Sequence, residues 1–104
     1  SIIDLSDSAS QPMKAPNGRF VLTYNGEIYN YVELKRQLEK LGHVFFSVSD
    51  TEVVLNSLIE WGVEAIPKFN GMFSFAFFDR STKELMFFVS SSSALIAVTA
   101  CERS

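Results

Sequence analysis

The strongest constraint on the fold is a run of alternating aromatic residues in the second half of the chain. The segment 71–79 reads Gly-Met-Phe-Ser-Phe-Ala-Phe-Phe-Asp, which places Phe73, Phe75 and Phe77 on one side of an extended strand. A short turn then leads into a second strand over 84–89. Both strands are apolar on both faces, so the sheet that contains them is expected to be covered on both sides.

Amphipathic segments can cover one of these faces. Helices are predicted over 31–41 and 51–61, because each segment has one apolar stripe at helical spacing. A further strand is predicted over 20–24, a short extended run over 43–48, and one more helical turn over 65–69. The fold class is therefore α+β, a two-layer arrangement with two helices on one face of an antiparallel sheet. The sequence offers no element to cover the other face.

Composition excludes several classes of function. The 104 residues suit one small domain with a single core. A net charge of −3 without any basic cluster argues against nucleic-acid binding. No apolar run approaches the roughly 20 residues of a membrane span, and no spacing suggests a metal or a cofactor. One cysteine cannot form an internal disulfide, so a cytoplasmic location is expected.

A candidate site follows the first predicted strand, in the segment 25–30 that reads Asn-Gly-Glu-Ile-Tyr-Asn. An Asn side-chain amide and a Gly backbone N–H can together bind an oxyanion, and a neighbouring carboxylate can bind a substrate ammonium. The alternative interpretation is a turn between a strand and a helix, because Asn30 with Glu33 has the pattern of a capping box.

Five segments in this order carry a family resemblance. They are Ser-Ile-Ile-Asp-Leu at 1–5, Gln-Pro-Met at 11–13, the segment 25–30, Ser-Asp-Thr-Glu at 49–52 and Asn-Gly-Met-Phe-Ser-Phe-Ala at 70–76. Together they resemble the glutaminase domain of asparagine synthetases, a class II glutamine amidotransferase with the N-terminal-nucleophile hydrolase fold. The resemblance implies that 1–89 form half of the four-layer αββα fold of that family, and that 90–104 are a tail outside it.

The resemblance also implies roles for six residues. The oxyanion of the reaction would be stabilised by the side-chain amide of Asn25 and the backbone N–H of Gly26. The substrate glutamine would be held by Ile2, Ile3, Glu27 and Asp50, with the two carboxylates at its amino group and the two isoleucine backbones along its pocket.

Asp50 has a second interpretation that needs no substrate. It lies inside another capping-box pattern, formed by Ser49 and Glu52. An acidic residue at the start of a helix stabilises the positive end of the helix dipole. Both interpretations of Asp50 stay open at this point.

The sequence departs from the family pattern in the residues of the chemistry. In this family the nucleophile is an N-terminal cysteine, and an arginine that binds the glutamine carboxylate lies just before the segment that matches Ser1. Neither residue stands there in these 104 residues. The single cysteine, Cys101, is interpreted as inert and the single histidine, His43, as structural, because nothing in the sequence brings them together.

Two hypotheses follow. In the first, the chain is an enzyme fragment that keeps part of a glutamine site, binds glutamine weakly if at all, and is inactive in glutamine hydrolysis. In the second, it is a small self-associating α/β protein with an unrelated role. The uncovered face of the sheet predicts a homo-oligomer under either hypothesis.

Overall fold

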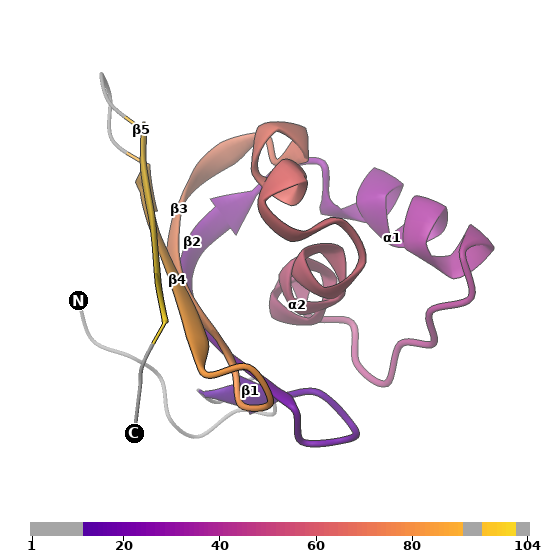
Figure 1. Ribbon diagram of the computed structural model, residues 1–104. Helices are drawn as coiled ribbons and strands as arrows, with labels where there is room; N and C mark the ends of the chain where they lie inside the picture. Colours follow the sequence, from indigo (N-terminus) through magenta and orange to yellow (C-terminus); the bar gives the residue numbers. More distant parts are fainter. Residues whose placement is uncertain (1–11, 91–94, 102–104) are drawn as a thin grey trace.

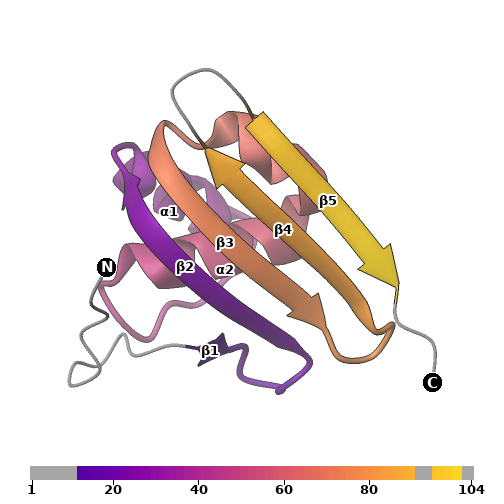
Figure 2. The same cartoon turned by 90° about the vertical axis from the view of Figure 1, so that its left-hand side faces the viewer.

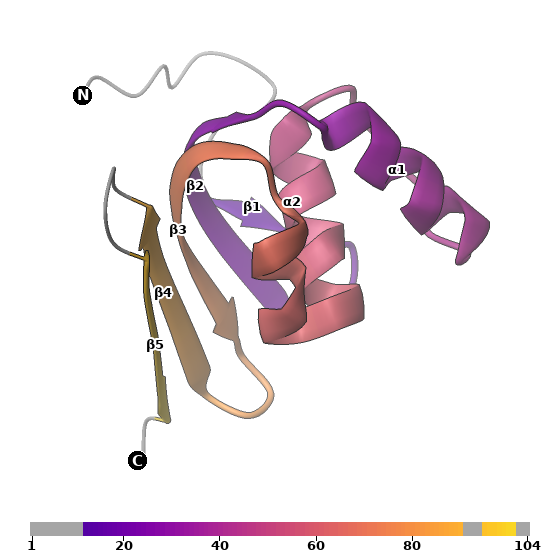
Figure 3. The same ribbon diagram turned by 90° about the horizontal axis from the view of Figure 1, so that it is seen from above.

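The sheet has five antiparallel strands, and the helices lie on one of its faces (Figure 1, Figure 3). The computed structural model describes residues 12–90 and 95–101. The strands, which follow sequence order across the sheet, are β1 (Met13–Lys14), β2 (Phe20–Ile28), β3 (Gly71–Asp79), β4 (Glu84–Ser90) and β5 (Leu95–Cys101). The helices are α1 (Tyr31–Lys40), α2 (Asp50–Trp61) and the 3-10 helix η1 (Gly62–Lys68). The predicted α+β architecture is confirmed.

The pairing of β2 with β3 forms the centre of the sheet (Figure 2). It runs over nine positions, from Phe20 opposite Asp79 to Ile28 opposite Gly71. The sequence predicted that β2 ends at residue 24, and this was wrong. The strand continues through the Asn-Gly-Glu segment because β3 supplies a pairing partner for every one of those residues.

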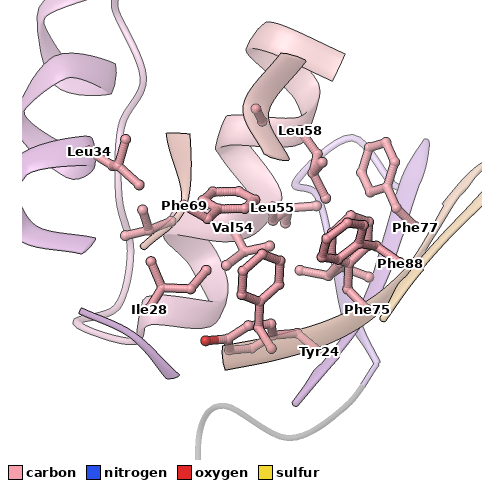
Figure 4. Packing of buried hydrophobic residues seen from close by; sticks show 14 of the residues in the cluster. Tyr24, Ile28, Leu34, Val54, Leu55, Leu58, Phe69, Phe75, Phe77 and Phe88 are labelled. Carbon is pink, nitrogen blue, oxygen red and sulfur yellow. The ribbon is translucent and has the colours of Figure 1, made fainter. Parts of the chain in front are cut away.

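Alternation along β3 and β4 sends one set of aromatic rings towards the helices. Phe73, Phe75 and Phe77 are buried, as is Phe88 from β4, and all four belong to one hydrophobic cluster with residues of α2. Figure 4 shows Phe75, Phe77 and Phe88 in this cluster beside Leu55 and Leu58. The Phe88 ring stacks on Phe73 and Phe75, with ring centroids 5.0 and 5.7 Å apart. The aromatic strand therefore contributes one side of the hydrophobic core, as predicted.

The opposite face of the sheet carries apolar side chains that remain exposed. Met72 is 58% exposed, Phe87 48% and Val89 52%. Strand β5 does not cover this face, because it pairs edge to edge with β4 in the same sheet (Figure 2). The tail thus widens the sheet.

Two local predictions were wrong because side-chain hydrogen bonds to other parts of the chain replace the expected local ones. The run 43–48 is an irregular loop, since the Glu52 carboxylate accepts the backbone N–H groups of Phe46 and Ser47 at 2.9 and 2.8 Å. Asn30 does not cap α1. Its side chain instead donates to the carbonyl of Lys68, the last residue of η1, and accepts from the Asn70 N–H.

The predicted helical turn after α2 is present as η1. Within the described residues, no helix is long and apolar enough to cross a membrane.

Candidate functional site

The segment Asn25-Gly26-Glu27 lies inside β2, where its three residues pair with Ser74, Phe73 and Met72 of β3. Gly26 has a φ of +117°, a backbone conformation that residues other than glycine rarely adopt. A Cβ at this position would collide with the Met72 carbonyl oxygen and lie 2.6 Å from the Phe73 Cα. The glycine of the motif is therefore required for the close approach of two strands.

Asp50 is the first residue of α2, and its side chain faces the sheet. The helix is capped by Ser49, whose hydroxyl oxygen accepts from the Thr51 N–H at 3.0 Å. The Asp50 carboxylate has another partner: the Tyr24 hydroxyl donates to its Oδ2 at 3.0 Å. Ser49 thus caps the helix, but through Thr51 and not through Glu52 as the predicted capping box requires. The Asp50 side chain is bonded to β2.

One pocket brings the two predicted ammonium-binding carboxylates together. Its volume is about 460 Å³, and it lies between the end of β2 and the start of α2. It is lined by Glu27, Ile28, Tyr29, Tyr31, Val48, Ser49 and Asp50. Two carboxylates from segments far apart in the sequence therefore share one small open cavity, a geometry suited to a cationic group.

The phenol that bonds to Asp50 stays protonated. Tyr24 is 4% exposed and belongs to the buried cluster seen in Figure 4. Burial is the largest cause that raises the pKa of Tyr24 well above its ordinary value. The Asp50 charge, the hydrogen bond to Asp50 and the Glu27 charge raise the pKa further. Near neutral pH, Tyr24 therefore acts as a hydrogen-bond donor to Asp50.

The loop that forms the far wall of the pocket is held by Glu52. Besides the two backbone N–H groups, its carboxylate accepts from the Ser47 hydroxyl at 2.7 Å, and the Glu52 side chain is buried. Ser47 Oγ in turn accepts from the Ser49 N–H at 3.2 Å. These bonds fix the backbone immediately before Asp50.

Sequence reasoning missed both Tyr24 and Glu52 as parts of the site. Tyr24 directly precedes the motif and was interpreted only as a strand residue. A phenol next to a polar motif, on the inward face of a strand, was the available signal. Glu52 was interpreted as half of a capping box, whereas its carboxylate bonds to the preceding loop.

The remaining predicted site residues are distributed differently. Asn25 is exposed on the face of β2 opposite to Tyr24, and neither Asn25 nor Gly26 lines the pocket. Ile2 and Ile3 lie outside the described residues.

Cys101 is far from this motif in the register of the sheet. It pairs with Glu84, which pairs with Asp79, which pairs with Phe20. Cys101 is therefore level with Phe20, which lies five positions from Asn25, or about 17 Å along the strand. It also lies three strands away from β2, or about 14 Å across the sheet.

His43 contacts α2, away from the pocket. Its Nδ1 lies 3.1 Å from Asn56 Oδ1 and its Nε2 lies 2.8 Å from Glu60 Oε1. Among the residues that the structure describes, no cluster of three metal-ligating side chains occurs.

Comparison with known proteins identifies the family. Residues 1–89 match the sequence pattern of the glutamine amidotransferase domain. The chain belongs to this family. The asparagine synthetase (glutamine-hydrolyzing) 3 of Bacillus subtilis is 37% identical over 89 residues, which cover 84% of this chain and 14% of that protein. The chain therefore spans about one seventh of the length of this relative.

Solved structures of amidotransferases share the fold. The glutamine phosphoribosylpyrophosphate amidotransferase from B. subtilis superimposes with a TM-score of 0.60 at 22% identity, covering 85% of this chain and 24% of that one. A structure described as the allosteric regulatory enzyme of purine biosynthesis gives a TM-score of 0.64 at 26% identity, covering 81% of this chain and 20% of that one. The class II amidotransferase fold expected from the sequence is thereby confirmed.

The close approach of Gly26 to β3 can be tested by substitution in this amidotransferase domain. Gly26→Ala is expected to destabilise the fold more than Gly42→Ala does. Both glycines have positive φ, a strain of about 1–3 kcal/mol for alanine, but nothing lies within 4 Å of a Cβ at Gly42. Gly26→Ala adds a collision with β3, whose overpacking cost is about 1–3 kcal/mol. Urea denaturation measures the difference, and equal losses for the two variants would contradict the role given to the β2–β3 contact.

Proposed function

We propose that this chain carries part of a glutamine-binding site of the asparagine-synthetase type, centred on the pocket between β2 and α2. The observation that carries the proposal is the meeting of Glu27 and Asp50 in one cavity, in a chain of the glutamine amidotransferase family. A glutamine α-ammonium between the two carboxylates would form charge-assisted hydrogen bonds with both.

The oxyanion part of the site is assigned to the strand itself. The Asn25 side-chain amide and the Gly26 backbone N–H are adjacent donors of the kind that stabilise a tetrahedral oxyanion. Support comes from the rigid position of Gly26 against β3. The proposal keeps Ile2 and Ile3 as pocket-lining residues on the resemblance alone.

Acyl transfer also needs a thiolate that attacks the amide carbon. Cys101 pairs with Glu84 at the other end of the sheet, which argues against it as that nucleophile. We therefore propose that these 104 residues by themselves do not turn over glutamine. The division into a family domain over 1–89 and a tail over 90–104, and the cytoplasmic location, are kept as predictions.

Ammonia release from glutamine tests this proposal. We expect no release above the uncatalysed rate from the wild-type chain, from Asn25→Ala or from Cys101→Ser, because donors without a nucleophile leave little catalysis. Turnover that Cys101→Ser abolishes would contradict the assignment of the cysteine. Turnover that only Asn25→Ala abolishes would mean that another group of the chain completes the site.

A second role, self-association, is favoured by the exposed face of the sheet. Met72, Phe87 and Val89 lie on β3 and β4, and each is about half exposed, so each forgoes about half of the roughly 1.5–3 kcal/mol that full burial contributes. A second copy that presents the same face would bury these side chains reciprocally. This role is compatible with a glutamine site, because the pocket lies on the helix side of β2.

Light scattering at micromolar concentration tests self-association. The wild-type chain is expected to have the mass of a dimer or a larger oligomer, and the double variant Phe87→Ser/Val89→Ser the mass of a monomer. Val63→Ser is the matched control, because Val63 is similarly exposed at 51% but lies in η1. A monomeric wild type, or a control that dissociates equally, would contradict the proposed surface.

A further inference from the structure

We infer that Tyr24 is a positioning residue that holds the Asp50 carboxylate for the α-ammonium of the ligand, and thereby sets a preference for an α-amino acid over the same molecule without its amino group. This inference rests on the proposed glutamine site and assigns it a specificity-determining residue on a different element from the carboxylate it controls.

The backbone atoms on both sides of this contact are fixed independently. Tyr24 sits in the middle of β2, paired with Phe75, and its ring is packed in the core. Asp50 stands at the start of α2, behind the Ser49 cap and the loop held by Glu52. What the backbone does not fix is the rotamer of the Asp50 side chain, and the Tyr24 hydroxyl bonds directly to that carboxylate.

One hydrogen bond leaves the Asp50 carboxylate free to accept others. A carboxylate has two oxygens with about four acceptor sites, and the phenol occupies one of them on Oδ2. The remaining sites can accept from an ammonium in the pocket that Asp50 shares with Glu27. Because the side chain is already held, less conformational freedom is lost when the ligand binds.

The phenol can hold this position over the physiological pH range. Burial and the two neighbouring carboxylates keep Tyr24 in its neutral form, so it always has a proton to donate. A phenylalanine at the same position keeps the ring and its packing and removes only the donor. Tyr24→Phe is therefore a conservative probe of the hydroxyl.

The test compares two ligands on four proteins by NMR titration. The ligands are glutamine and glutaramic acid, which is glutamine without its α-amino group. The proteins are the wild-type 104-residue chain, Tyr24→Phe, Asp50→Asn and the double variant. We expect the wild type to bind glutamine more tightly than glutaramic acid. Tyr24→Phe is expected to lower the affinity for glutamine by about 2- to 10-fold, the contribution of one hydrogen bond. Its affinity for glutaramic acid is expected to stay unchanged.

The double variant separates positioning from simple stabilisation. If Tyr24 acts through Asp50, adding Tyr24→Phe to Asp50→Asn has no further effect on the preference. A Tyr24→Phe protein that loses affinity for both ligands equally, or that keeps the wild-type preference, overturns this inference while the glutamine site stands. A wild type that does not prefer glutamine overturns the glutamine site and this inference with it.

Discussion

The antiparallel pairing of β2 with β3 is the contact on which the rest of the structure depends. It is the longest strand pair, with nine matched positions, and it runs through the Asn-Gly-Glu motif. Its register also determines which side chains face the helices, because a shift by one residue would exchange the two faces of β2. Gly26 limits such shifts, since only glycine tolerates the approach of Met72 and Phe73 at that position.

This register has direct consequences for the pocket. It sends Tyr24 and Ile28 towards α2 and leaves Asn25 on the opposite face. Tyr24 then meets Asp50, and the end of β2 brings Glu27 to the rim of the same cavity. A motif that reads as one compact site in the sequence is therefore only partly gathered in the pocket: Glu27 and Asp50 line it, and Asn25 does not.

The parts of the fold that the sequence predicted are those with strong periodicity. The strand over 71–79 and both helices follow from apolar alternation or helical stripes, and they appear within about a residue of the expected bounds. The errors arose where long-range contacts outweigh local signals. The Asn-Gly pair at 25–26 has the local signature of a turn, and pairing with β3 keeps it extended. Asn30 has the signature of a cap, and its side chain bonds instead to residues about 40 positions away. Tyr24 had no signal beyond its place beside the motif, because its function depends on Asp50 reaching it from another element.

Chemical-shift mapping of the isotope-labelled chain with glutamine shows whether the pocket between β2 and α2 binds the amino end of this ligand, as proposed. We expect backbone shift changes concentrated at 27–31 and 48–51, the two segments that line the pocket. A second cavity of about 510 Å³, lined by Met13, Val44, Phe46 and Leu55 among others, provides the internal comparison. Changes centred on that second cavity, or none up to concentrations well above those of cellular amino acids, would contradict the proposed glutamine site.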